Sequence, residues 1–500
     1  MSGRERGSAL EDVGAQAREA WERQLRRQIS RRRFGALAAA YFAGAIGIDA
    51  LLAACGGSPA KVSGAGAGRS RAGGIQVVNF FTTENDPNTI AAANQAINDF
   101  EAKYPNVHVA MIIISGDERD ERARTGLAVG QDLGVFEIDR AYSIQFVQAG
   151  YLEPLDDLIK SVGADQFLVG TRQVIRGHDY VFPYGLGPFC LWYRTDLIPS
   201  PPKTVGDLIT VAREHTGGGK YGFTAALGAY GAVENTFPQF LWSQGTDYFD
   251  RSGNVIFGND RARAAIENVV TLLKYSPPGN TNWSAFQFIT NYLDQIVPMA
   301  PWAGRLGLNA YEQSPKLVPV TSVEQGPWGP VNAGLTRVST VAIDRKTAYP
   351  DLCKEWIKFY LTGKYGVAYA NSVPGQLIPS VANVREAALQ PANAAGLPLA
   401  DYVQAHKDWL TVLSNQAGHG TDPGGPMGAC ANGSLELYNG PAAPWALEVF
   451  GSNAVHMQML QKIVLQGYSV KDGQAWATDQ LKSIVNAYKA AHPDWKKYFE

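Results

Sequence analysis

The sequence predicts an α/β fold, in which a mostly parallel β-sheet is covered by helices on both faces. From residue 75 onward, short apolar runs alternate with amphipathic helical patterns, as is typical of such sheets. The chain has 500 residues, which is more than one compact domain usually holds, so more than one domain is expected. Apolar residues make up 45 % of the chain and charged residues 18 %, a balance that allows sizeable buried cores and excludes overall disorder.

The first strand and helix are clear from local signals. Residues 75–81 form a short apolar run suited to a buried strand. Asp86 and Pro87 then provide the N-cap and the first position of a helix. One face of this helix carries apolar side chains at helical spacing, namely Ile90, Ile97, Phe100 and Tyr104. The elements expected next are a strand at 107–114, a charged helix near 119–129, a strand at 135–138 and a helix that ends at Gly150.

Charge, cysteine content and motifs exclude several classes of function. The net charge of −2 gives no electrostatic case for nucleic-acid binding. The four cysteines are too few for a disulfide scaffold and lack the C-x-x-C spacing of a zinc site; among them, Cys190 is expected to be buried and reduced. Because the chain contains no H-E-x-x-H, G-x-S-x-G or P-loop pattern, we expect no catalytic residue, no metal and no cofactor.

The N-terminal segment has the features of an export signal. Nine arginines face only five acidic residues in residues 1–33, and Arg31, Arg32 and Phe34 form a twin-arginine pattern just before an apolar stretch. The stretch, residues 34–54, is rich in Ala and Gly and is interrupted by Asp49, so it is better suited to a signal peptide than to a membrane-spanning helix.

A lipid anchor is expected directly after this stretch. The sequence Leu-Ala-Ala-Cys that ends at Cys55 resembles the lipobox of bacterial lipoproteins, in which the cysteine thiol carries diacylglycerol. Residues 56–74 are rich in Gly, Ser and Ala and behave as a flexible tether with a reach of about 25 Å. Residues 1–55 are therefore interpreted as the signal peptide, and the globular part as a body held on the outer face of the bacterial cytoplasmic membrane.

Several segments of the body resemble the extracellular solute-binding proteins of ABC importers, and most closely their maltodextrin-binding class. The segments, in chain order, are "VNFFTTENDPNTIAAANQAINDFEAKYPNVHV", "VFEIDRAYSIQFVQAGYLEPLDDL", "YVFPYGLGPFCLWYRTDLIPSPPKTVGDL", "VPMAPWAG" and "ANSVPGQLIPS". The resemblance covers most of residues 75–380 and is loose beyond them.

The resemblance implies two α/β lobes that the chain crosses three times, with the ligand held in the cleft between them. One lobe would contain residues 75–187 and 300–372, and the other residues 190–298 and 376–500. It further implies capture of the ligand by hinge closure, delivery to ABC transporter permease subunits and a monomeric protein that is not an enzyme.

The same resemblance identifies candidate ligand-binding residues in the first lobe. Glu84 and Asn85 follow the first strand in a polar loop that contacts ligand in the family, although such side chains also cap helices. Phe136, Asp139 and Arg140 coincide with an aromatic residue and an Asp-Arg pair that bind sugar in the maltodextrin class, where Asp139 would accept from hydroxyls and Arg140 would orient it.

Aromatic candidates extend this site, because flat rings stack on the C–H faces of sugars. Trp302 matches the family's Gly-Pro-Trp tryptophan and is the strongest single candidate. Further possible contacts are Trp242, Tyr230, Asn235, Gln376 and Trp445.

Departures from the family pattern leave the ligand open. Gly187 stands where the maltodextrin class has a binding Glu, and residues 228–232 replace a Tyr-bearing loop. A different oligosaccharide or a disaccharide therefore fits better than maltodextrin. The alternatives are a glycerol phosphate, for which Arg140, Arg305 and Arg337 are available basic groups, a polyamine on the same scaffold, and an exported glycoside hydrolase.

Overall fold

The computed structural model describes residues 74–227, 237–250, 252–283, 286–418, 420–421, 443–450 and 454–498. Gly73–Glu500 form one compact unit, and all elements below belong to it. The other unit, Met1–Ala72, lies outside the described residues, together with the twin-arginine pattern and Cys55. Among the helices that are described, none combines the length and apolar character needed to cross a bilayer.

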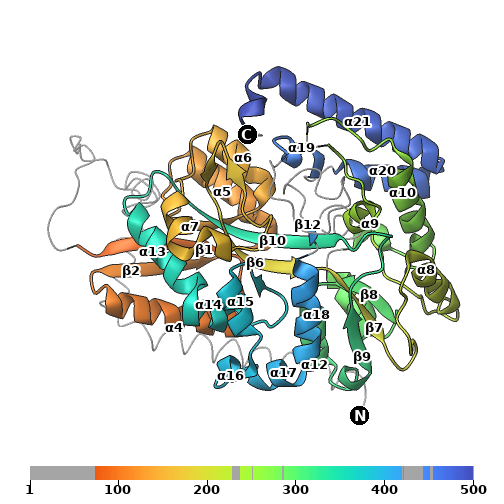
Figure 1. Ribbon diagram of the computed structural model, residues 1–500, viewed down its shortest axis with the longest axis horizontal. Helices are drawn as coiled ribbons and strands as arrows, with labels where there is room; N and C mark the ends of the chain where they lie inside the picture. Colours follow the sequence, from red (N-terminus) through yellow and green to blue (C-terminus); the bar gives the residue numbers. More distant parts are fainter. Residues whose placement is uncertain are drawn as a thin grey trace, which may run out of the picture. The chain divides into compact units, whose positions relative to one another are not determined.

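The largest sheet combines parallel and antiparallel strands (Figure 1). Its strand order is β11 (Ile378–Pro379), β6 (Phe182–Pro188), β10 (Gly334–Ile343), β3 (Val135–Ile138), β1 (Gln76–Thr82) and β2 (Val107–Ile113), and β12 (Gly420–Thr421) also pairs with β10. The pairs β1–β2 and β1–β3 are parallel, as expected, but β10 runs antiparallel to both β3 and β6. The expectation of a mostly parallel sheet is therefore wrong for the half built around β10.

A smaller antiparallel sheet and a short hairpin complete the strands. The order in the smaller sheet is β8 (Met299–Trp302), β7 (Cys190–Arg194) and β9 (Thr321–Glu324), and β4 (Val174–Ile175) pairs with β5 (His178–Asp179).

Helices follow most strands. In chain order the α-helices are α4 (Pro87–Lys103), α5 (Arg119–Ala128), α6 (Arg140–Gln148), α7 (Asp156–Val162), α8 (Val205–Glu214), α9 (Phe237–Ser243), α10 (Asp260–Leu273), α11 (Phe286–Leu293), α12 (Arg305–Gln313), α13 (Pro350–Leu361), α14 (Gly363–Ala370), α15 (Ala382–Ala388), α16 (Pro391–Ala394), α17 (Ala400–Ala405), α18 (Lys407–Ala417), α19 (Ala446–Phe450), α20 (Val455–Gln466) and α21 (Val470–Ala491). Short 3₁₀ turns lie at Gly116–Glu118, Ala164–Gln166, Asn280–Asn282, Val318–Val320 and Trp495–Tyr498.

Helix α4 begins as its sequence predicts. The side chain of Asp86 caps it by accepting a hydrogen bond from the backbone N–H of Asn88, and Pro87 occupies the first turn. Its buried residues are Thr89, Ala93, Ala96, Ile97 and Phe100. Ile90 and Tyr104, which were expected on the same face, are half-buried.

The two faces of the large sheet are both covered, so successive residues of a strand enter different cores. In β1, Val78 and Phe80 pack with α4 and α13, whereas Phe81 packs on the opposite face with residues of α5 and α6. In β3, Val135 and Phe136 divide in the same way. Burial on both faces explains why these strands read as continuous apolar runs.

The chain passes between the two sheets at the place where the first crossing was expected. Only Phe189 separates β6 in the large sheet from β7 in the small one. The return is later than expected, because both β8 and β9 pair with β7 and only β10 rejoins the large sheet. The two strands within residues 299–324, most of which were assigned from the sequence to the first lobe, therefore pair in the smaller sheet, and the lobe bounds stay a prediction.

Two glycines allow the later crossing segments to touch. A Cβ on Gly304, directly after β8, would lie 2.1 Å from the carbonyl oxygen of Gly375. Gly375 itself has a φ of +83°, which L side chains rarely adopt. The backbones of these two segments can approach this closely only without a side chain at residue 304.

Candidate functional site

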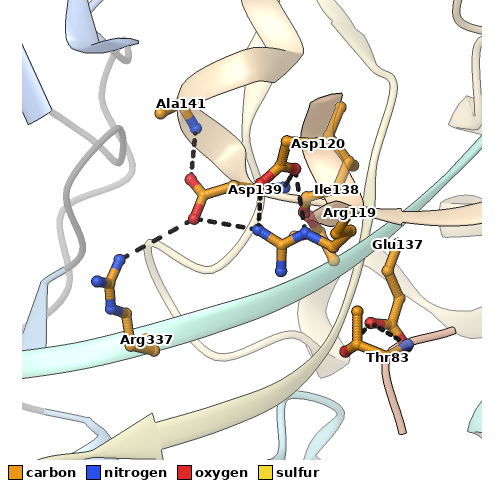
Figure 2. Close-up of polar contacts among 9 residues, drawn as sticks. Thr83, Arg119, Asp120, Glu137, Ile138, Asp139, Ala141 and Arg337 are labelled. Carbon is orange, nitrogen blue, oxygen red and sulfur yellow. Dashed lines mark hydrogen bonds and ion pairs between the residues drawn. The ribbon is translucent and has the colours of Figure 1, made fainter. Parts of the chain in front are cut away.

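Polar side chains gather where β1 and β3 end. These strands are parallel neighbours, with Phe81 paired to Phe136, so the residues that follow each of them meet at the same edge of the sheet. The carboxyl edge of such a sheet is where ligands bind in open α/β folds. Figure 2 shows the group, which includes Thr83, Glu137 and Asp139.

Glu137 is a buried carboxylate inside β3. Its side chain accepts three hydrogen bonds, from the hydroxyl of Thr82 at 2.5 Å and from the backbone N–H and hydroxyl of Thr83 at 3.1 and 2.6 Å (Figure 2 shows those from Thr83). These donors stabilise a charge in a position that is only 4 % exposed. Since they all belong to Thr82 and Thr83, the hydrogen bonds also connect the end of β1 to β3.

Glu84 follows in the same loop and is bound differently. One of its carboxylate oxygens accepts a hydrogen bond from the hydroxyl of Tyr369 at 3.0 Å. Burial and, after it, the nearby charge of Glu137 raise the pKa of Glu84 to about 7, although the hydrogen bond from Tyr369 acts in the opposite direction. This carboxyl group therefore exchanges a proton near neutral pH.

Asp139 lies between two arginines at the start of α6. Its Oδ1 accepts from the backbone N–H of Ala141 at 2.9 Å and so caps the helix. Its Oδ2 lies 3.5 Å from Nη2 of Arg119 and 4.0 Å from Nη1 of Arg337, which belongs to β10 (Figure 2). The side chain of Asp139 is still 27 % exposed, so part of the carboxylate is open to a ligand.

Arg119 is held in turn by Asp120. The guanidinium donates to both carboxylate oxygens of Asp120, at 3.0 and 2.7 Å, which is a bidentate pair. Asp120 also accepts from the backbone N–H of Asp139 at 2.9 Å. Burial raises the pKa of Asp120, while Arg119 lowers it. Asp120, Arg119 and Asp139 thus form a connected row of side chains whose charges alternate in sign.

The expected role of Arg140 in orienting Asp139 is wrong. Arg140 is 1 % exposed, and its Nη2 donates to the carbonyl oxygen of Gly170 at 3.4 Å. The guanidinium groups beside Asp139 are instead those of Arg119 and Arg337. Arg140 is the first residue of α6 and Asp139 is the N-cap, so their two side chains point in different directions.

The predicted aromatic contacts are covered in this conformation. Phe136 is 2 % exposed and packs with α5 and α6. Trp302 is 8 % exposed, with Phe189 and Phe288 at ring-centroid distances of 5.4 and 5.3 Å. Trp242 donates its indole N–H to Asp247 at 3.0 Å, and Trp445 is fully buried. None of these rings offers a free face here, and their role in binding stays a prediction.

The remaining candidates are dispersed. Asn85 is exposed, and Gln376 is half-buried with its side-chain oxygen in a buried position. Tyr230 and Asn235 lie outside the described residues. A cavity of about 640 Å³ is lined by residues of α10 and α21 and the loop before α10, and it includes none of the predicted binding residues. Cys190 and Cys353 are free and buried, as expected for Cys190.

Sequence reasoning missed Arg119, Asp120, Glu137 and Tyr369. A charged residue inside an otherwise apolar strand was an available signal for Glu137, because a buried carboxylate needs dedicated partners. Arg119 and Asp120 lie in the charged run "GDERDERAR", and nothing in the sequence distinguishes them from the solvent-exposed charged residues of the same run. Tyr369 reaches Glu84 only through the fold. Within the part of the chain that is described, no group of His, Cys, Asp and Glu is placed to hold a metal ion.

Comparison with known families decides what kind of protein this is. Residues 86–366, more than half of the chain, match the pattern of bacterial extracellular solute-binding proteins. The chain belongs to this family. This family is a scaffold for binding solutes.

Individual relatives are distant in sequence. This solute-binding protein is 23 % identical to the maltotriose-binding protein of Pyrococcus abyssi over 167 residues, which are 32 % of this chain and 36 % of the relative. It is 25 % identical to a binding protein of Brucella abortus over 244 residues, or 46 % and 59 % of the two chains. The chain thus matches less than two thirds of the length of each of these relatives.

Solved structures confirm the two-lobed fold. Maltose-bound MalE3 of T. maritima has a TM-score of 0.63 at 19 % identity, over 82 % of this chain and all of that one. An ABC transporter solute-binding protein of Thermotoga lettingae, bound with α-D-tagatose, has a TM-score of 0.67 at 15 % identity with the same coverage. The GacH receptor of Streptomyces glaucescens has 0.65 at 15 %, over 82 % of this chain and 99 % of the receptor.

Proposed function

We propose that this solute-binding protein captures an oligosaccharide or disaccharide between its lobes and delivers it to the permease of an ABC importer. The observation that carries the proposal is the convergence on Asp139 of groups from three separate segments, namely the guanidinium of Arg119 in α5, the backbone N–H of Ala141 in α6 and the guanidinium of Arg337 in β10. A ligand that contacts Asp139 would therefore contact the part of the sheet that leads into the other lobe.

The chemistry of the group suits hydroxyl groups. Glu84 and Asp139 accept hydrogen bonds, and Arg119 and Arg337 donate them, so that both functions of a sugar hydroxyl have partners. Trp302, Trp242 and Phe136 would add apolar faces if lobe movement uncovered them. The chain is similar to a maltotriose-binding protein and to structures described as bound with maltose and with tagatose, which supports a carbohydrate over other solutes as the ligand.

The proposed location follows from the N-terminal segment. Export by the twin-arginine route, lipidation at Cys55 and a tether over residues 56–74 would hold the body on the outer face of the cytoplasmic membrane. Such a protein would work as a monomer beside its permease.

A thermal-shift screen of the purified full-length chain tests the ligand class. Sugars, glycerol phosphates, polyamines and amino acids are added in turn, and a ligand that binds only the native state raises the melting temperature. We expect a carbohydrate to give the largest shift, and Asp139→Asn to weaken its binding about tenfold, because a charged hydrogen-bond acceptor is lost. Asp479→Asn, at an exposed position of α21, is the matched control. A shift by polyamines with no shift by any carbohydrate would contradict the proposal.

A cationic ligand is the second candidate, and the charges of the site favour it. Around Glu84 and Asp139, carboxylates outnumber guanidinium groups; the carboxylates are Glu84, Asp86, Asp120, Glu137 and Asp139, and the guanidinium groups are Arg119, Arg305 and Arg337. Asp139→Asn would then nearly abolish binding instead of weakening it. A phosphate ligand is less favoured, because Arg305 and Arg337 face different carboxylates, Asp86 and Asp139.

A further inference from the structure

Three fully buried side chains beside β10 have polar atoms without a hydrogen-bond partner among the described residues. They are the indole nitrogen of Trp328, the hydroxyl of Thr336 and both amide atoms of Gln416. All three residues are 0 % exposed. They come from three segments, namely the loop before β10, β10 itself and α18.

These atoms lie on one side of the strand. A Cβ built on Gly334, the first residue of β10, would be 3.1 Å from Nε2 of Gln416 and 3.6 Å from Nε1 of Trp328. Both nitrogens therefore face the same point above Gly334. Thr336 is two residues further along the strand, so its side chain points to the same face.

Trp328 cannot turn its N–H toward another partner. The indole lies against the backbone of Gly326, where a Cβ would come 1.7 Å from a ring atom, and the ring of Phe240 packs on it at a centroid distance of 5.3 Å. Leaving such a buried donor unpaired destabilises a protein, and native structures almost always provide a partner.

We propose that Trp328, Thr336 and Gln416 bind a neutral hydroxyl oxygen, either of a buried water molecule or of the carbohydrate ligand. Such an oxygen would accept from the indole N–H and donate to the amide or hydroxyl oxygen, a combination that water and alcohols both provide. A charged occupant does not fit, because an indole, an amide and a hydroxyl cannot compensate a buried charge. The ligand as source rests on the proposed function, whereas water as source does not.

The site lies along β10, the strand that returns from the smaller sheet to the large one, and on the face opposite to the side chain of Arg337. Thr336 directly precedes Arg337, whose guanidinium lies beside Asp139 on the candidate site. The bound oxygen would thus join α18 and the loop before β10 to the strand that carries Arg337.

Crystal structures of the full chain, one grown without ligand and one soaked in maltose, test the proposal directly. We expect an oxygen within about 3.2 Å of both Nε1 of Trp328 and the amide of Gln416. Its presence in the ligand-free crystal identifies water, and its appearance only in the soaked crystal, bonded to carbon, identifies a ligand hydroxyl. A direct bond from Trp328 to Gln416 with no oxygen in either crystal would overturn the proposal. Failure of maltose to bind leaves the ligand-free crystal decisive.

Solution measurements on Gln416→Leu provide an independent test. Oxygen-17 relaxation dispersion of the solvent counts long-lived internal waters, and we expect the variant to lose one relative to the wild type if water is the occupant. Gln390→Leu, at an exposed position, is the control and should lose none. An unchanged signal in Gln416→Leu, together with crystals in which the site holds no oxygen, would refute both sources. A merely structural role of Gln416 would lower the melting temperature without changing the count.

Discussion

Two neighbouring carboxyl groups, the half-buried Glu84 and the buried Glu137, are accommodated in different ways. Glu137 receives three hydrogen bonds from Thr82 and Thr83, which compensate its charge. Glu84 receives one from Tyr369 and lies close to the charge of Glu137, so its pKa rises to about 7. At neutral pH about half of the folded molecules therefore carry a proton on Glu84, which an unfolded chain would have released.

Glu84→Gln should change how stability depends on pH. A raised folded-state pKa stabilises the wild type fully below the unfolded value of 4.5, and this contribution is lost as the pH rises toward 7. We expect the melting temperature of the variant to exceed that of the wild type at pH 8 and to differ little from it at pH 5. Thermal unfolding at both pH values, with exposed Glu386→Gln as the control, measures the difference. Equal differences at the two pH values would contradict the assignment.

The pair of Arg119 and Asp120 should contribute more to stability than another arginine pair in the same helix. Arg119→Met leaves the carboxylate of Asp120, which is 7 % exposed, without its bidentate partner. We expect a loss of about 2–3 kcal/mol, somewhat below that for a fully buried pair because Arg119 is 22 % exposed. Arg124→Met removes a pair with Glu121 in which both side chains are more than half exposed, and should cost under about 1 kcal/mol. Urea denaturation of both variants makes the comparison, and equal losses would be evidence against it.

At the level of elements, local signals predicted the first half of the large sheet correctly. Strands β1, β2 and β3 and helices α4, α5 and α6 begin and end within a few residues of the expected positions, because caps, proline and apolar spacing act locally. The antiparallel course of β10 and the pairing of β9 with β7 were not predictable in this way, because they depend on contacts between residues far apart in the chain.

The candidate site was predictable only in part, for a related reason. All four residues of β3 are buried, so the alternation that normally separates the two faces of a strand is missing from its sequence. Phe136 and Glu137 therefore could not be assigned to the core and to the polar edge from their order alone. Asp139 could be located, because it directly follows the strand and caps the next helix.

The contact between the two crossing segments leads to a prediction at this scale. Gly304→Ala would bring its Cβ to 2.1 Å from the carbonyl oxygen of Gly375, and the backbone must move to relieve the overlap. We expect a loss of about 1–3 kcal/mol in unfolding free energy, or more if the segments separate. Gly187→Ala at the first crossing is the matched control, because its nearest atom would be 3.6 Å away. Chemical denaturation measures both, and a Gly304→Ala variant as stable as the control would contradict the close packing.

At the level of the whole molecule, the structure contains direct contacts between the proposed lobes. Gln145 of α6 donates to Glu448 of α19 at 2.9 Å, and Gln148 of α6 donates to the hydroxyl of Tyr488 of α21 at 2.8 Å. Under the proposed hinge closure, these contacts would stabilise the closed arrangement before a ligand binds.

Tyr488→Phe should open the molecule slightly. The variant removes the hydroxyl that accepts from Gln148 and keeps the ring, so the closed arrangement loses about 1 kcal/mol, or about fivefold in its ratio to the open one. Small-angle X-ray scattering should show a larger radius of gyration without ligand, and calorimetry a weaker binding of the ligand found by the screen. Tyr468→Phe, at an exposed position before α21, is the control, and an unchanged scattering profile in Tyr488→Phe would argue against this contact as a closure element.

The link between the two sheets has a fixed length for a geometric reason. Because side chains alternate along a strand, one extra residue beside Phe189 would rotate β7 by half a period and exchange its two faces. Trp192, now buried with its indole bonded to the carbonyl oxygen of Trp302, would then exchange sides with Leu191. Insertions in homologous chains should therefore be absent at this link, or come in pairs.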